Sequence, residues 1–191
     1  MGNNLERIVS VSIDIASPIV DSSSFDNLLI FGPEPAKKGH TAPPVGVYSG
    51  LSEVTGAGYV AVGENADIVG VAARIAFSQA PPPSHIYIGT LGAEEDISEK
   101  LDGLLSVDGW YAICPVGLTQ EQLKTVIQWT EAQKKICAFA AYGPAESTET
   151  VYYRSFGIYC KRNSTQADED VPLENQCIGV AWAAKCLNYH A

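Results

Sequence analysis

The segment IYIGTLGAEEDISEKLDGLLSVDGWYAIC, residues 86–114, contains the alternation on which the fold prediction rests. Its beginning, Ile86–Gly89, and its end, Trp110–Cys114, are each expected to form a strand. Between them, residues 94–105 have the spacing of a helix with one apolar side, which is formed by Ile97, Leu101, Leu104 and Leu105. A strand, a helix and a second strand in this order form a βαβ unit with parallel strands.

The same alternation continues toward both ends of the chain. Further strands are expected at Leu28–Gly32, Val45–Tyr48, Ile136–Ala141 and Gly157–Cys160, and further helices at 65–79, from Thr119 onward, at 144–154 and at 172–187. Asn65 is expected to cap the first of these helices, and Thr119 with Gln122 forms a capping box at the second. The sequence therefore predicts an α/β fold, with a mostly parallel sheet and helices on both of its faces.

The composition excludes several classes of protein. The chain has 191 residues, enough for one well-buried domain or for one domain with an arm. The chain has 12 Lys and Arg residues and 22 Asp and Glu residues, which gives a formal net charge of −10. Because nucleic-acid binding needs clustered positive charge, nucleic acid is not an expected partner. No apolar run approaches the roughly 18 residues of a membrane span, so membrane insertion is not expected. A hydrophobic content of 46% excludes an intrinsically disordered chain.

The cysteines and the N-terminus indicate where the chain is assembled. The five cysteines are widely spaced in apolar runs, which favours buried thiols over disulfides or zinc ligands; they are Cys114, Cys137, Cys160, Cys177 and Cys186. The N-terminus lacks the basic and apolar segments of a signal peptide. We therefore expect assembly in a reducing cytoplasm.

Residues 1–22 are patterned separately from the α/β alternation that follows. Within them Val9, Val11, Ile13 and Ile15 alternate with polar residues, the period-two pattern of a half-buried strand. We expect an N-terminal arm at residues 1–22 and an α/β domain at 23–191. The arm strand has three options: the edge of its own sheet, an antiparallel flap, or the sheet edge of another subunit.

One glycine-rich stretch could hold a small molecule. Gly56–Ala61 matches the relaxed dinucleotide fingerprint, and the loop Gly56–Gly63 is thus the basis of an alternative function, a small-molecule-binding domain or enzyme. The fingerprint requires glycines placed directly between a strand and a helix, and here the expected strand ends several residues earlier. An ordinary glycine-rich loop explains the stretch better, and no cofactor is expected.

No other motif indicates catalysis or metal binding. The three histidines, His40, His85 and His190, are too scattered to predict convergence on a metal or a nucleophile. The acidic clusters at 94–96 and 168–170 precede or open helices, where negative charge stabilises the helix N-terminus. We therefore expect neither an enzyme nor a metal site.

The order of the features resembles a known family. The stretches that carry the resemblance are IVSVSI at 8–13, LLIFG at 28–32, VYSGLSEV at 47–54, AARIAFSQ at 72–79, PPPSHIYIG at 81–89 and WYAI at 110–113. Together they are similar to the sheath proteins of contractile bacteriophage tails and related injection machines. The resemblance covers about residues 5–190, and its motifs are patterns of apolar and turn residues.

The resemblance implies a structural role. Sheath subunits stack around an inner tail tube, and their contraction drives that tube through a cell envelope; terminal arms complete the sheets of neighbouring subunits. The expected partners are therefore other copies of this chain, the tail tube and the baseplate, and the expected location is a virion tail. Residues 8–15 match the arm in position and pattern. Full sheath proteins are usually longer, so the chain is expected to be truncated or a short relative. A tail terminator or baseplate adaptor is a further alternative.

Overall fold

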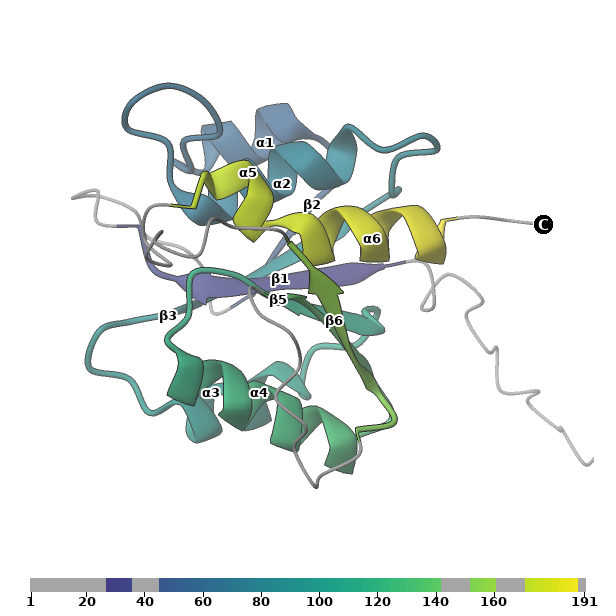
Figure 1. Cartoon of the computed structure of the whole chain (residues 1–191). Helices are drawn as coiled ribbons and strands as arrows, with labels where there is room; N and C mark the ends of the chain where they lie inside the picture. The colour runs from purple at the N-terminus through teal and green to yellow at the C-terminus, as the bar shows by residue number, and fades with distance from the viewer. Residues whose placement is uncertain (1–26, 36–44, 142–151, 161–170, 189–191) are drawn as a thin grey trace, which may run out of the picture.

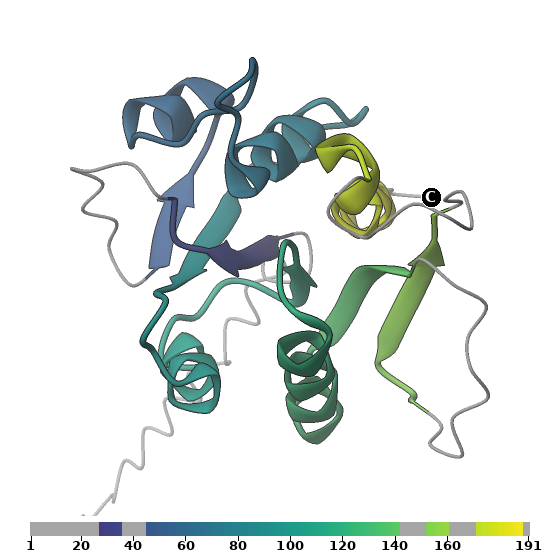
Figure 2. The same cartoon turned by 60° about the vertical axis from the view of Figure 1, so that its left-hand side comes forward.

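A six-stranded sheet forms the centre of the molecule. The computed structural model describes residues 27–35, 45–141, 152–160 and 171–188. The strand order is β2-β3-β1-β4-β5-β6 (Figures 1 and 2). The strands are β1 (Leu28–Pro33), β2 (Val45–Tyr48), β3 (Ile86–Leu91), β4 (Ala112–Pro115), β5 (Ile136–Ala141) and β6 (Ser155–Tyr159). Five of these strands are parallel, and β2 pairs antiparallel with β3.

Helices cover both faces of this sheet. They are α1 (Leu51–Gly56), α2 (Ile68–Phe77), α3 (Ile97–Leu104), α4 (Gln120–Ala132), α5 (Leu173–Gln176) and α6 (Ile178–Leu187). One face is covered by α1, α2, α5 and α6, and the other by α3 and α4 (Figures 1 and 2). The prediction of a mostly parallel α/β sheet with helices on both faces is confirmed.

The central strand β1 shows why its sequence is continuously apolar. Leu28 and Ile30 lie in the core beneath α2 and α6, whereas Leu29 and Phe31 lie in the core above α3 and α4. All four side chains are fully buried. A central strand between two helical layers has no polar face, because successive side chains point into opposite cores.

The strand order defines where a ligand would bind in such a fold. The chain passes from β1 to β3 on one side and then crosses to β4 on the other side of β1. This reversal between β1 and β4 is a topological switch point, and open α/β sheets bind ligands at the carboxyl ends of the strands near it. The carboxyl edge of the sheet is therefore the first place to look for a site.

Two helix starts differ in how well the sequence predicted them. The capping box of α4 is confirmed, because Gln122 N–H donates to Thr119 Oγ1 and Thr119 N–H donates to Gln122 Oε1. The prediction that Asn65 caps α2 is wrong. Asp67 takes that position, and its carboxylate accepts N–H groups from both Gly70 and Val60. The hydrogen bond from the Val60 N–H holds the preceding loop against the helix. This bond favours Asp67 over Asn65 as the cap of α2.

Three further elements differ from the prediction. Leu51–Gly56, for which neither a helix nor a strand was predicted, forms the short helix α1. The single helix expected at 172–187 is divided into α5 and α6 at Cys177, whose backbone leaves the helical range. Most of the helix expected at 144–154 lies outside the described residues, but Tyr152–Arg154 are not helical and lead into β6.

Candidate functional sites at the carboxyl edge and the open edge of the sheet

A small cavity lies at the carboxyl ends of β4 and β5. Its volume is about 340 Å³, and it is lined by Pro115–Gln120, Leu123, Phe139, Ala140 and Gln176. None of these side chains is ionisable and none is a thiol, so the described part of the lining supplies no general acid, general base or thiol nucleophile. The Thr119 hydroxyl already serves the capping box of α4.

The helix N-termini in this part of the fold are occupied by the chain's own acceptors. Asp67 caps α2, and the Asp96 carboxylate accepts N–H groups from Ser98 at 2.8 Å and Glu99 at 3.0 Å at the start of α3. A dinucleotide places its pyrophosphate at such a terminus, where free N–H groups and the helix dipole attract anions. The negative charge of Asp67 and Asp96 opposes phosphate at both positions.

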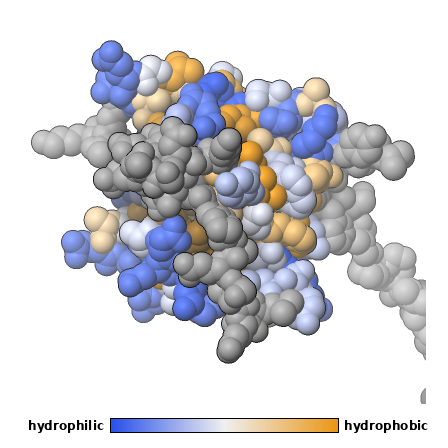
Figure 3. All heavy atoms as spheres, viewed as in Figure 1, coloured by the Kyte–Doolittle hydropathy of each residue, from blue (hydrophilic) through white to orange (hydrophobic). Residues whose placement is uncertain are grey.

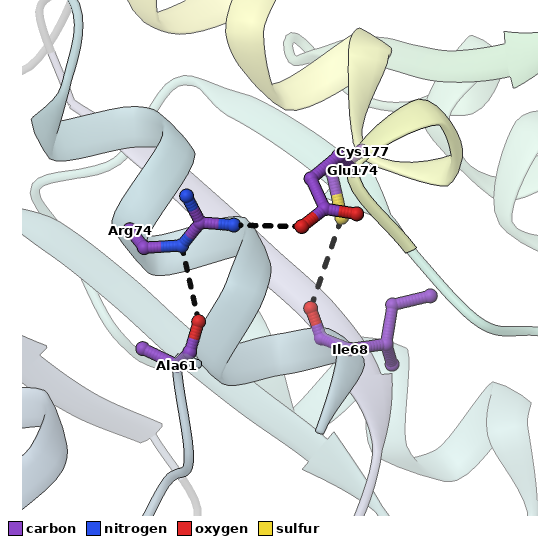
Figure 4. Close-up of polar contacts among 5 residues, drawn as sticks. All are labelled: Ala61, Ile68, Arg74, Glu174 and Cys177. Carbon is purple, nitrogen blue, oxygen red and sulfur yellow. Dashed lines mark hydrogen bonds and ion pairs between the residues drawn. The ribbon is translucent and has the colours of Figure 1, made fainter. Parts of the chain in front are cut away.

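The Gly56–Gly63 loop does not have the arrangement of a nucleotide-binding turn. Gly56 is the last residue of α1, so a helix and not a strand precedes the loop. Gly58 and Gly63 have φ angles of +102° and +92°, which glycine adopts readily. Arg74 Nε donates to the Ala61 carbonyl at 3.0 Å and fixes the loop against α2 (Figure 4). The glycines therefore allow the backbone turns in the connection between α1 and α2.

The polar contacts in Figure 4 join the C-terminal helices to α2. Arg74 Nη2 lies 3.0 Å from Glu174 Oε1, and the Cys177 thiol donates to the Ile68 carbonyl at 3.8 Å. Burial raises the pKa of Cys177 to about 12. Burial also raises the pKa values of Cys114 and Cys137 well above the ordinary value. These thiols stay protonated near neutral pH and are poor nucleophiles.

The prediction of buried cysteines is correct at four positions and wrong at one. Cys114, Cys137, Cys160 and Cys177 are buried, whereas Cys186 is exposed on α6, and all five are free thiols. Gly179, Val180, Ala183 and Ala184 form the buried side of α6. Cys186 lies in the last turn of α6, at the margin of this buried side, and the apolar run in the sequence did not reveal its exposure.

The remaining candidates for chemistry stay apart from one another. His85 is exposed beside Ser84, and His40 and His190 lie outside the described residues. In the first acidic cluster, Asp96 caps α3 and Glu95 pairs with Lys100; the second cluster, 168–170, is also outside the described part. Within the described ranges, no three His, Cys, Asp or Glu residues gather in a way that could hold a metal ion.

The outer side of β6 is a more distinctive feature. Cys137 N–H donates to the Arg154 carbonyl and Cys160 N–H donates to the Ala141 carbonyl, both at 2.8 Å. Hydrogen bonding alternates along a parallel strand, so the even-numbered residues from 154 to 160 bond to β5. The N–H and C=O groups of Ser155, Gly157 and Tyr159 therefore point away from β5, and no strand in the described part of the chain pairs with them.

Large aromatic side chains surround this edge. Tyr153, Phe156 and Tyr159 are 81%, 40% and 60% exposed. The Phe156 ring lies 5.4 Å from the Trp182 ring of α6. On the face shown in Figure 3, apolar side chains reach the surface in the region of α6 and β6, between hydrophilic areas. Exposed aromatic residues along a sheet edge are typical of a surface that binds protein.

A carboxylate from α4 fixes the amino end of β6. Glu131 accepts N–H groups from Tyr153 at 2.9 Å and Arg154 at 2.8 Å, and the Ser155 hydroxyl at 2.9 Å. Burial by itself would raise the pKa of Glu131, but these hydrogen bonds outweigh it and lower the pKa. The start of β6 is thus held in place by Glu131.

The sequence did not identify the β6 edge as a candidate surface. It predicted a strand at 157–160, two residues late, and its position at the end of the sheet follows only from the tertiary structure. The arm residues that the sequence did single out, Val9, Val11, Ile13 and Ile15, lie outside the described residues.

Comparison with models of known protein families gave no match, and comparison with curated proteins gave none either. The resemblance to tail sheath proteins therefore rests on the sequence motifs. In the described part of the chain, no helix is both long enough and apolar enough to cross a lipid bilayer.

Proposed function

We propose that the chain is a structural subunit that polymerises with copies of itself, in the manner of a contractile tail sheath protein. It would surround an inner tail tube, and its contraction would drive that tube through a cell envelope. The observation that carries the proposal is the outer edge of β6, where exposed aromatic side chains accompany backbone groups that no strand among the described residues pairs with.

An edge of this kind is unusual on a protein that works alone. Proteins normally protect outer strands with charged residues, proline or a bulge, because an unprotected edge pairs with other chains. The sequence of β6, Ser155–Tyr159, contains neither a charged residue nor proline. The absence of such protection supports an edge that pairs in the working state.

The domain behind this edge is suited to transmitting force. The helix α6 packs so closely on β5 that a Cβ atom at Gly179 would lie 2.7 Å from the Ala138 carbonyl oxygen. Such packing makes a domain that moves as a rigid unit, and rigid units with two alternative interfaces can store and release a conformational change. Contraction of a sheath would use the free-energy difference between two packings and no chemical reaction.

The N-terminal arm supplies the proposed link between subunits. Val9, Val11, Ile13 and Ile15 form the apolar side of the predicted strand at 8–15. An extended segment that joins a neighbour's sheet gains backbone hydrogen bonds for strength and alternating side chains for register. Arms of this kind keep subunits connected while their domains move.

A second candidate is the binding of a small molecule, and the cavity beside α4 favours it. Its volume of about 340 Å³ is at the lower end of the range for ligand pockets. A ligand would have to be held by apolar contact with Leu123 and Phe139 and by neutral amides such as Gln176. Stabilisation of the purified chain by an uncharged ligand, measured as a rise in Tm, would support this candidate.

Negative-stain electron microscopy of the purified chain separates the assembly proposals. Rings or tubes that grow with protein concentration support a sheath-like subunit. One closed oligomer that grows no further supports the tail terminator or baseplate adaptor. Single particles of monomer size at all concentrations would contradict both.

A further inference from the structure

We draw no further inference here: the strongest candidate, the cavity of about 340 Å³ at the carboxyl ends of β4 and β5, belongs to the candidate site already described, and nothing in the structure shows what covers it, because residues 142–151, which follow β5, and residues 161–170, which precede α5, lie outside the described part of the chain.

Discussion

Gly179 and Asp67 show how single residues determine the packing of whole helices. Gly179 allows α6 to approach the β5 backbone, and Asp67 fastens the loop before α2 to the first turn of that helix. The spacing of apolar residues predicts neither contact, because both depend on the backbone of a segment that is distant or irregular. Capping by Thr119 and Gln122 was predictable, because its hydrogen bonds stay within four residues.

Replacement of Gly179 by alanine is expected to destabilise the domain. The added Cβ would lie 2.7 Å from the Ala138 oxygen and 2.8 Å from the Phe139 Cα atom, so α6 must shift. Overpacking of this kind costs about 1–3 kcal/mol in the free energy of unfolding, measured by urea denaturation. Gly103→Ala on α3 is the matched control, because a Cβ atom there meets nothing within 4 Å. That control is expected to be neutral or stabilising, and equal losses in both variants would contradict the role of Gly179.

Asp67→Ala is expected to cost more stability than Asp96→Ala. Both variants remove a cap, which costs about 1 kcal/mol. Asp67→Ala also leaves the Val60 N–H of the partly buried loop without its acceptor, whereas the Asp96 bonds are exposed. Thermal denaturation of the two variants measures the difference, and an equal fall in Tm would show that the Val60 bond contributes nothing.

At the scale of elements, the attachment of β6 depends on a carboxylate of α4. Glu131 is separated in the sequence by more than twenty residues from the groups that it binds, so no local sequence pattern predicts the contact. The βαβ unit at 86–114 was predictable because periodicity within each segment determines it. Contacts between segments determine the short helix α1, the break at Cys177 and the position of β6 at the sheet edge. These three features were therefore not predictable from the sequence.

Glu131→Gln is expected to lose stability at neutral pH but not at low pH. The pKa of Glu131 is lowered in the folded state from the ordinary value of 4.5. Its ionised form therefore contributes stability above that value, and the contribution disappears as the pH falls through the folded-state pKa. Urea denaturation of wild type and Glu131→Gln should give free energies of unfolding that differ at pH 7 and converge as the pH falls from 4.5 through the lower folded-state pKa. A difference that stays constant with pH would contradict the ionic role of Glu131.

At the scale of the whole molecule, the described interior offers no reactive group, whereas the outer edge of β6 is not paired with any described strand. The cavity lining that the structure describes has no ionisable side chain. The starts of α2, α3 and α4 are capped by side chains of the chain itself, and the buried thiols remain protonated. The outer side of β6, in contrast, presents backbone donors, acceptors and aromatic rings. The sequence was sufficient to predict an α/β domain and to propose assembly, whereas the surface that would carry the assembly appeared only with the sheet order.

Sedimentation velocity of the wild-type chain over a wide range of concentration tests the proposed self-assembly most directly. We expect the sedimentation coefficient to rise with concentration as copies associate through their sheet edges, and species far heavier than the 20.4 kDa chain to appear. A single species of 20.4 kDa at every concentration would contradict a subunit that works by binding copies of itself.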